Sequence, residues 1–169
     1  MGYLADLFQE GKVQEFNAYR KKHPDIDLID LSGVEVNGKS FSGIDLSGVA
    51  LFEAHFANCD FSEADFSGAE LRGAFFGACN FTHAQFGNAN CQKAKFIGCV
   101  MREASFMVLS AEEALFIGRD ENFLPARQYL ERSEFERAHI NPQVTFVMPI
   151  GRPGAETKHQ NAPTTRTLQ

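Results

Sequence analysis

Tryptophan is absent from the 169 residues, and basic residues are outnumbered by acidic ones, 16 to 22. The resulting net charge of -6 argues against direct binding to nucleic acid or to an anionic membrane, because both attract basic surfaces. No run approaches the roughly eighteen apolar residues of a membrane-spanning helix. The amino terminus has no basic segment followed by an apolar one, so we predict a cytoplasmic chain without a secretory signal.

Phenylalanine, by contrast, occurs seventeen times. Every fifth residue from Phe41 to Phe116 is bulky and apolar except Cys91 and Ala111, and the residue two places earlier is small or apolar throughout. A period of five fits neither a helix nor a long strand. It predicts a chain that turns a corner every five residues and winds into a solenoid, in which each turn buries its apolar layer against its neighbours.

The stretch 60–81, DFSEADFSGAELRGAFFGACNF, resembles the pentapeptide repeat family, whose pattern is A-[DN]-[LF]-x-x. The resemblance covers about residues 31–118. It implies an all-β solenoid, a right-handed quadrilateral β-helix with four pentapeptides per turn, so that residues twenty apart lie above one another. The predicted core comprises Phe56, Phe61, Phe66, Phe76, Phe81, Phe86, Phe96, Phe106 and Phe116 with Cys59, Cys79 and Cys99.

The ends of the repeat predict two caps, because an open solenoid exposes strand edges and an apolar layer. Residues 1–24 indicate an amino-terminal cap of two short amphipathic helices that are separated at Gly11. Residues 25–118 form the β-helix. Residues 119–148 are expected to form a second cap from a helix and a terminal strand, and residues 149–169 a polar, mobile tail.

Residues 33–40, GVEVNGKS, match the phosphate-binding pattern G-x-x-x-x-G-K-[ST] letter for letter. Such a loop follows a buried strand and opens a helix, whose backbone N–H groups face the anion. Here the motif leads into further repeats, and Val34 and Val36 fall on interior positions. The sequence therefore favours a turn-rich first coil over a nucleotide site, and we predict no cofactor.

Two histidine–cysteine spacings invite a zinc interpretation, since His55 precedes Cys59 by four residues and Cys79 precedes His83 by four. The register places both thiols inside the solenoid and both imidazoles outside. The pairs would then lie on opposite sides of the wall. We predict reduced core thiols and no metal site.

Acidic residues precede basic ones along the repeat. The candidate partner-binding carboxylates are Asp45, Glu53, Asp60, Glu63, Asp65 and Glu70. We expect the last four to be exposed on a convex rod that offers no pocket to desolvate a carboxylate pair, so we predict no enzyme. The predicted function is that of a protein-binding scaffold, with an unidentified protein as its partner.

Some members of the family, of the quinolone-resistance type, resemble B-DNA in shape and acidity and bind type II topoisomerases. The resemblance therefore implies an alternative function as a DNA mimic. Two features differ from that type. The positive residues Arg72, Lys93, Lys95 and Arg102 follow the acidic ones, and no loop interrupts the repeat from Phe41 to Phe116.

Four apolar residues are predicted to point outward on a single face: Phe75, Ile97, Leu115 and Ile117. An apolar patch of this kind requires a cover. The alternatives are the carboxyl-terminal helix of the same chain, a partner protein, or a homodimer formed through the carboxyl-terminal end.

Overall fold

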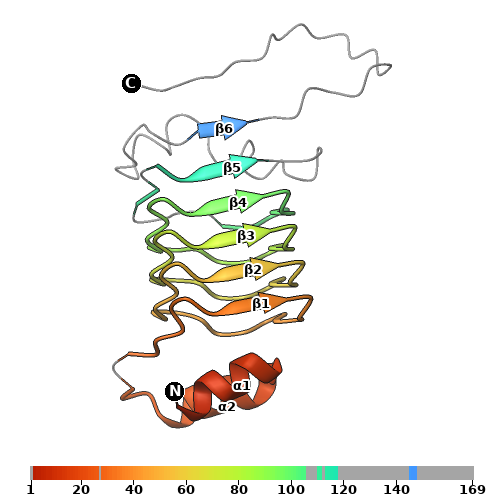
Figure 1. The fold of residues 1–169 in the computed structure, drawn as a ribbon. Coiled ribbons are helices and arrows are strands. Elements are labelled where there is room, and N and C mark those ends of the chain that lie inside the picture. The colour runs from red at the N-terminus through yellow and green to blue at the C-terminus, as the bar shows by residue number, and fades with distance from the viewer. Residues whose placement is uncertain (1, 27, 106–109, 112, 118–144, 148–169) are drawn as a thin grey trace, which may run out of the picture.

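The computed structural model describes a capped solenoid (Figure 1). The described residues are 2–26, 28–105, 110–111, 113–117 and 145–147. In chain order their elements are α1 (Tyr3–Glu10), α2 (Val13–Lys22), β1 (Glu35–Asn37), β2 (His55–Ala57), β3 (Phe75–Gly77), β4 (Lys95–Ile97), β5 (Leu115–Ile117) and β6 (Thr145–Val147). The strands form one parallel sheet in sequence order. Neither of these helices is long and apolar enough to cross a bilayer.

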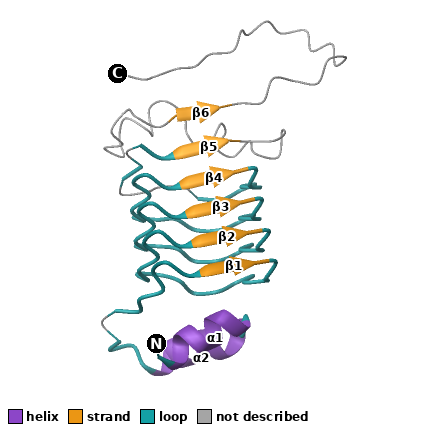
Figure 2. Ribbon diagram, viewed as in Figure 1, coloured by secondary structure: helices purple, strands orange, loops and turns teal. Residues whose placement is uncertain are grey.

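One turn of the solenoid takes 20 residues, since Val36 pairs with Phe56 and Phe56 with Phe76. The other sides of each turn meet through single bridges at the same spacing, among them Ser40 with Asp60 and Asp45 with Asp65. Strands therefore mark only one of four sides, as Figure 2 shows. The predicted four-sided, all-β solenoid with twenty residues per turn is confirmed.

Each side of the solenoid carries its own set of residues. We call the side formed by β1–β6 the strand face. The sides that come after it along the chain are the second, third and fourth faces, and in one turn they are centred on Phe61, Phe66 and Leu71.

The spacing along the chain is larger between β5 and β6 than between the earlier strands. Leu115 pairs with Thr145, thirty residues further on, whereas each earlier strand pairs with a strand twenty residues away. Ten extra residues therefore lie between β5 and β6, beyond residue 118, where the predicted β-helix ends. Of the predicted second cap only β6 is described. The predicted helix of that cap, the tail 149–169 and the core residue Phe106 lie outside the described residues.

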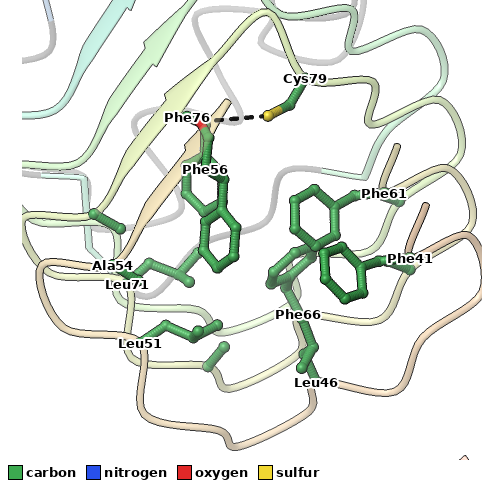
Figure 3. Packing of buried hydrophobic residues seen from close by; sticks show 14 of the residues in the cluster. Phe41, Leu46, Leu51, Ala54, Phe56, Phe61, Phe66, Leu71, Phe76 and Cys79 are labelled. Atoms are coloured by element: carbon green, nitrogen blue, oxygen red, sulfur yellow. Dashed lines mark hydrogen bonds between the residues drawn. The ribbon is translucent and has the colours of Figure 1, made fainter. Parts of the chain in front are cut away.

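The core consists of aromatic stacks that run along the rod. Phe61 stacks on Phe41 with ring centroids 5.1 Å apart and on Phe81 with centroids 5.4 Å apart. The neighbouring stack contains Phe56 and Phe76, and its rings meet those of the first stack edge-on (Figure 3). Successive turns lie about 4.8 Å apart, so like rings at one position stack with a slight offset. Every predicted core residue that the structure describes is buried.

The chain turns each corner in a left-handed conformation. The residue two places after each central residue has φ between 52° and 72° wherever it is described. Gly68 occupies one such corner with φ 66°, while Glu53 and Ala78 occupy others with φ 54° and 52°. Glycine adopts this conformation without strain, but a residue with a Cβ pays about 1–2 kcal/mol.

The two helices close the first turn of the solenoid. Leu4, Leu7 and Phe8 are buried on α1, and Phe16 is buried on α2. The ring of Phe8 stacks on that of Phe41 with centroids 4.5 Å apart and planes 10° apart, so α1 extends the phenylalanine stack. Two short helices separated at Gly11 were predicted, and the structure confirms them.

Side chains of α2 also bind the open backbone edge of the first turn. The Asn17 amide donates to the Gly43 carbonyl at 2.8 Å and accepts from the Asp45 N–H at 2.9 Å. Arg20 donates to the Ser47 carbonyl at 2.7 Å and to the Asp45 carboxylate at 3.2 Å. These polar groups replace the peptides of a preceding turn, which would otherwise satisfy that edge.

Substituting the corner residue Gly68 by alanine isolates the strain of the left-handed turn. A methyl group there would meet only the Gly48 nitrogen, at 4.0 Å, so no clash is expected. Gly68→Ala should lower the free energy of unfolding by about 1 kcal/mol in urea denaturation. Gly87 is the matched control, because its φ is not left-handed and a methyl group would meet only Ser67 Oγ, at 3.6 Å. Equal losses in the two variants would contradict this explanation.

Removing the ring that closes the stack should destabilise the whole rod. Phe8→Ala leaves a cavity against Phe41 and should cost about 3–5 kcal/mol of unfolding free energy. Tyr3→Ala on the same helix is the control, with an expected loss below about 1 kcal/mol because Tyr3 is 55% exposed. Thermal or urea unfolding measures both, and similar losses would show that Phe8 does not close the stack.

Candidate protein-binding surface

The six candidate carboxylates lie on three faces of the rod, and none lies on the strand face. Asp60 and Glu63 belong to the second face, Asp45 and Asp65 to the third, and Glu53 and Glu70 to the fourth. A partner that contacts all six would have to surround the rod.

Asp60 and Glu70 connect neighbouring turns. The Asp60 carboxylate accepts from the Ser62 N–H at 3.0 Å and from the Asn80 amide of the next turn at 2.9 Å. Glu70 accepts from the Asn90 amide at 2.9 Å. Both residues are half-buried, so the expectation that they are exposed is wrong. The residue before each central residue forms the backbone bridge to the neighbouring turns. Its side chain therefore lies along the surface of the solenoid.

The carboxylates of the third face bond to their own turn and to the cap. Asp65 is also half-buried rather than exposed, and its carboxylate accepts from the Ser67 N–H at 2.8 Å. Asp45 accepts from the Ser47 N–H at 3.0 Å and forms the ion pair with Arg20 of the cap. These carboxylates stabilise the turns that carry them, because each satisfies a backbone donor at a corner.

Glu53 and Glu63 differ from the other four carboxylates. Both are exposed, and both occupy left-handed corners with φ 54° and 59°. Within the described part of the chain, neither forms a side-chain hydrogen bond or an ion pair. The side chain of Glu53 lies over Gly73, where an added methyl group would meet Glu53 Cγ at 3.3 Å. These two carboxylates are the members of the set that are free for a partner.

Charge is separated along the rod. Residues 30–70 contain eight carboxylates and one basic residue, Lys39, whereas residues 71–102 contain four basic residues and no acidic one. Part of the positive charge is already engaged, since the Arg72 guanidinium lies 4.9 Å from the centre of the Phe52 ring. The first two turns therefore present the acidic surface.

The four outward apolar residues lie where the sequence placed them, on the strand face. Phe75 and Leu115 share a column with Lys95, and Ile97 and Ile117 share the next column. All four are half-buried. Gly77 makes room for the Phe75 ring, because a methyl group at Gly77 would meet that ring at 2.9 Å. The result is a low apolar surface over β3–β5.

Comparison with known proteins assigns the repeat. Residues 49–120 match a family model described as a pentapeptide repeat region. This part of the chain belongs to the pentapeptide repeat family. The expectation from the resemblance is thereby confirmed, and the solenoid is a pentapeptide repeat.

Several solved structures are similar to this pentapeptide repeat. HetL, a pentapeptide repeat protein of the cyanobacterium Nostoc involved in heterocyst differentiation regulation, is 21% identical, with 56% of this chain and 44% of HetL covered and a TM-score of 0.40. A trypsin-treated variant of QnrB1, a plasmid-mediated fluoroquinolone resistance protein, is 23% identical, with 53% and 56% covered and a TM-score of 0.37. Rfr23 of the cyanobacterium Cyanothece is 21% identical, with 64% and 97% covered and a TM-score of 0.33.

These likenesses are limited in extent. The matched region spans less than two thirds of HetL and of QnrB1. Among curated proteins, none matches the sequence.

The stretch 33–40 forms part of the first turn of the pentapeptide repeat. It contains β1, whose central Val36 is buried, and the Lys39 carbonyl accepts from the Asp60 N–H at 2.9 Å. The chain then continues into the second face at Phe41 rather than into a helix. The segment therefore lacks the helix N-terminus on which phosphate binding by this motif depends.

The thiols lie inside the repeat and the two histidines outside it. Cys59, Cys79 and Cys99 are buried in one column, while His55 and His83 are exposed. The described part of the chain contains no group of three histidine, cysteine or carboxylate side chains that could hold a metal ion.

A cavity of ≈ 400 Å³ separates α2 from the start of the repeat. Its lining consists of Asn17, Arg20, Lys21, His23, Pro24, Ile26, Ile29 and Asp45. Asn17, Arg20 and Asp45 already bond the cap to the first turn. Arg20 and Asp45 in the lining of the cavity therefore serve the junction.

The buried thiol of Cys91 predicts a loss of stability at high pH. Burial raises its pKa above the value of about 8.5 that it has in the unfolded chain. The folded state binds the thiol proton more tightly than the unfolded state does. The contribution of the protonated thiol to stability is therefore complete below pH 8.5 and is lost as the pH rises beyond that value. The free energy of unfolding should decrease above pH 8.5 in the wild type and decrease less in Cys91→Ala. Identical pH profiles would contradict this assignment.

Proposed function

We propose that the chain is a non-enzymatic scaffold that binds a protein partner through the first two turns of its pentapeptide repeat. The observation that carries this proposal is the charge of residues 30–70, eight carboxylates against one lysine on a regular surface. Such a surface attracts a basic region of a partner and accelerates their encounter.

The hydrogen bonding of the carboxylates supports a binding role over a catalytic one. Asp60, Asp65 and Glu70 accept hydrogen bonds from the wall itself, while Glu53 and Glu63 point into solvent. A catalytic pair requires two carboxyl groups held in different, partly desolvated environments. A rigid surface with preset charges suits binding, because little side-chain order is lost when the partner arrives.

A second candidate is a DNA-mimicking modulator of a type II topoisomerase, the function that the quinolone-resistance members of the family imply. The observation that favours it is the distribution of the carboxylates over three faces, since phosphates likewise surround a duplex. On this proposal the acidic turns would occupy a DNA-binding surface. The basic residues from Arg72 onward would lie beyond it. Nucleotide binding by residues 33–40 is not proposed, because that segment forms the first turn.

The free corner carboxylates provide a test that leaves the fold intact. Glu53→Gln with Glu63→Gln removes two charges without removing any hydrogen bond to the wall, unlike changes at Asp60 or Asp65. We expect recovery of the specific partner from a lysate of the source cell to decrease about tenfold. The decrease should be larger at low salt, because salt screens the contacts that these exposed charges make. Quantitative mass spectrometry measures the recovery.

The matched control for this experiment is Glu15→Gln on α2, which removes a charge outside the repeat. Partner recovery that is insensitive both to the double variant and to salt would contradict binding through the acidic turns. A supercoiling assay with purified gyrase or topoisomerase IV separates the two candidates. No effect of the wild-type chain in molar excess would exclude the second candidate and leave the first.

A further inference from the structure

Two columns of outward side chains cross the strand face from β2 to β5. The residue before each central position contributes the first column, His55, Phe75, Lys95 and Leu115. The residue after it contributes the second column, Ala57, Gly77, Ile97 and Ile117. In the second column the small residues lie on β2 and β3 and the large ones on β4 and β5. In the first, the aromatic rings lie on β2 and β3.

The strand face is complementary to a second copy of itself whose strand order is reversed. A two-fold axis that runs parallel to the strands, midway between β3 and β4, reverses the strand order while each column still faces its own counterpart. Ile97 then lies opposite Gly77 of the second copy, where the Phe75 ring of that copy fills the space of the missing side chain, and Ile117 lies opposite Ala57. We propose that two copies of the chain pack antiparallel through the strand face about this axis.

The same axis gives Lys95 a partner. Lys95 is exposed, and within the described part of the chain it forms no ion pair. In the dimer it lies opposite Phe75 of the second copy, whose ring rests against Gly77. A lysine ammonium is attracted to the face of an aromatic ring, more strongly where water is excluded. The two-fold symmetry produces this pair twice.

Two other positions of the axis fit the face less well. An axis through β4 would bring Lys95 against Lys95, which is repulsive. An axis between β2 and β3 would leave Leu115 and Ile117 outside the contact. The axis between β3 and β4 covers the four outward apolar residues without opposing like charges.

The size of the face determines the strength of the dimer. Four strands spaced about 4.8 Å apart and five residues wide give a face of roughly 20 by 16 Å. This is smaller than the roughly 800 Å² per partner of a stable complex, so we expect a dimer that dissociates on dilution. The candidate carboxylates lie on the other three faces and stay accessible in it. The dimer is therefore independent of the function proposed above.

Reciprocal charge changes test the proposal and its register together. Phe75→Lys places two lysines opposite each other, and Lys95→Glu places a carboxylate against the Phe75 ring. Each variant alone should weaken the dimer about tenfold or more in sedimentation equilibrium of the full chain. An equimolar mixture should form heterodimers with about wild-type affinity. In the heterodimer the introduced lysine of the first variant meets the introduced glutamate of the second, while the native Lys95 of the first meets the native Phe75 of the second.

Matched controls are Gln85→Lys and Gln85→Glu, which make equivalent charge changes at an exposed position on the third face. Both should dimerise like the wild type, and circular dichroism should show that every variant is folded. A wild-type chain that stays monomeric at millimolar concentration would overturn the proposal, as expected if residues 118–144 cover the face. A dimer that neither single variant weakens, or that the mixture does not restore, would also overturn it.

Discussion

Hydrogen bonding between residues twenty apart is the constraint on which the rest of the structure depends. The Phe61 N–H donates to the Asn80 carbonyl at 2.7 Å, and the Asn80 N–H donates to the Cys59 carbonyl at 2.9 Å. This parallel ladder fixes the turn spacing and sets each side chain directly above its counterpart. Interior positions must then accept the same kind of residue turn after turn, which explains the phenylalanine stacks and the cysteine column.

The same constraint explains the amino-terminal cap. A stack of identical turns has no intrinsic end, because its first turn leaves an aromatic layer and a row of backbone groups open. The cap supplies both missing parts, with Phe8 as the next ring and the side chains of Asn17 and Arg20 as substitutes for peptides. Helices can end this solenoid because these three side chains reproduce what a further turn would offer.

The constraint also divides the surface into two kinds of position. Some side chains next to an interior residue accept hydrogen bonds from the backbone, as those of Asp60 and Asp65 do, and so support the fold. Corner side chains such as Glu53 and Glu63, and the outward residues of the strand face, do not support the fold in this way. The fold leaves these positions open to contact with another protein, because the backbone is satisfied without them.

The sequence by itself determined the period of five, the interior positions and the two amino-terminal helices, because each follows from the spacing of apolar residues along the chain. The turn of twenty residues was implied by the resemblance to pentapeptide repeats. Only the tertiary structure decided that Asp60, Asp65 and Glu70 are half-buried along the solenoid surface while Glu53 and Glu63 are exposed. The bonds from Asn80 to Asp60 and from Asn90 to Glu70 join residues twenty apart in the chain, and the left-handed corners accept glycine, glutamate and alanine alike, so the local pattern of residues carries no signal for them.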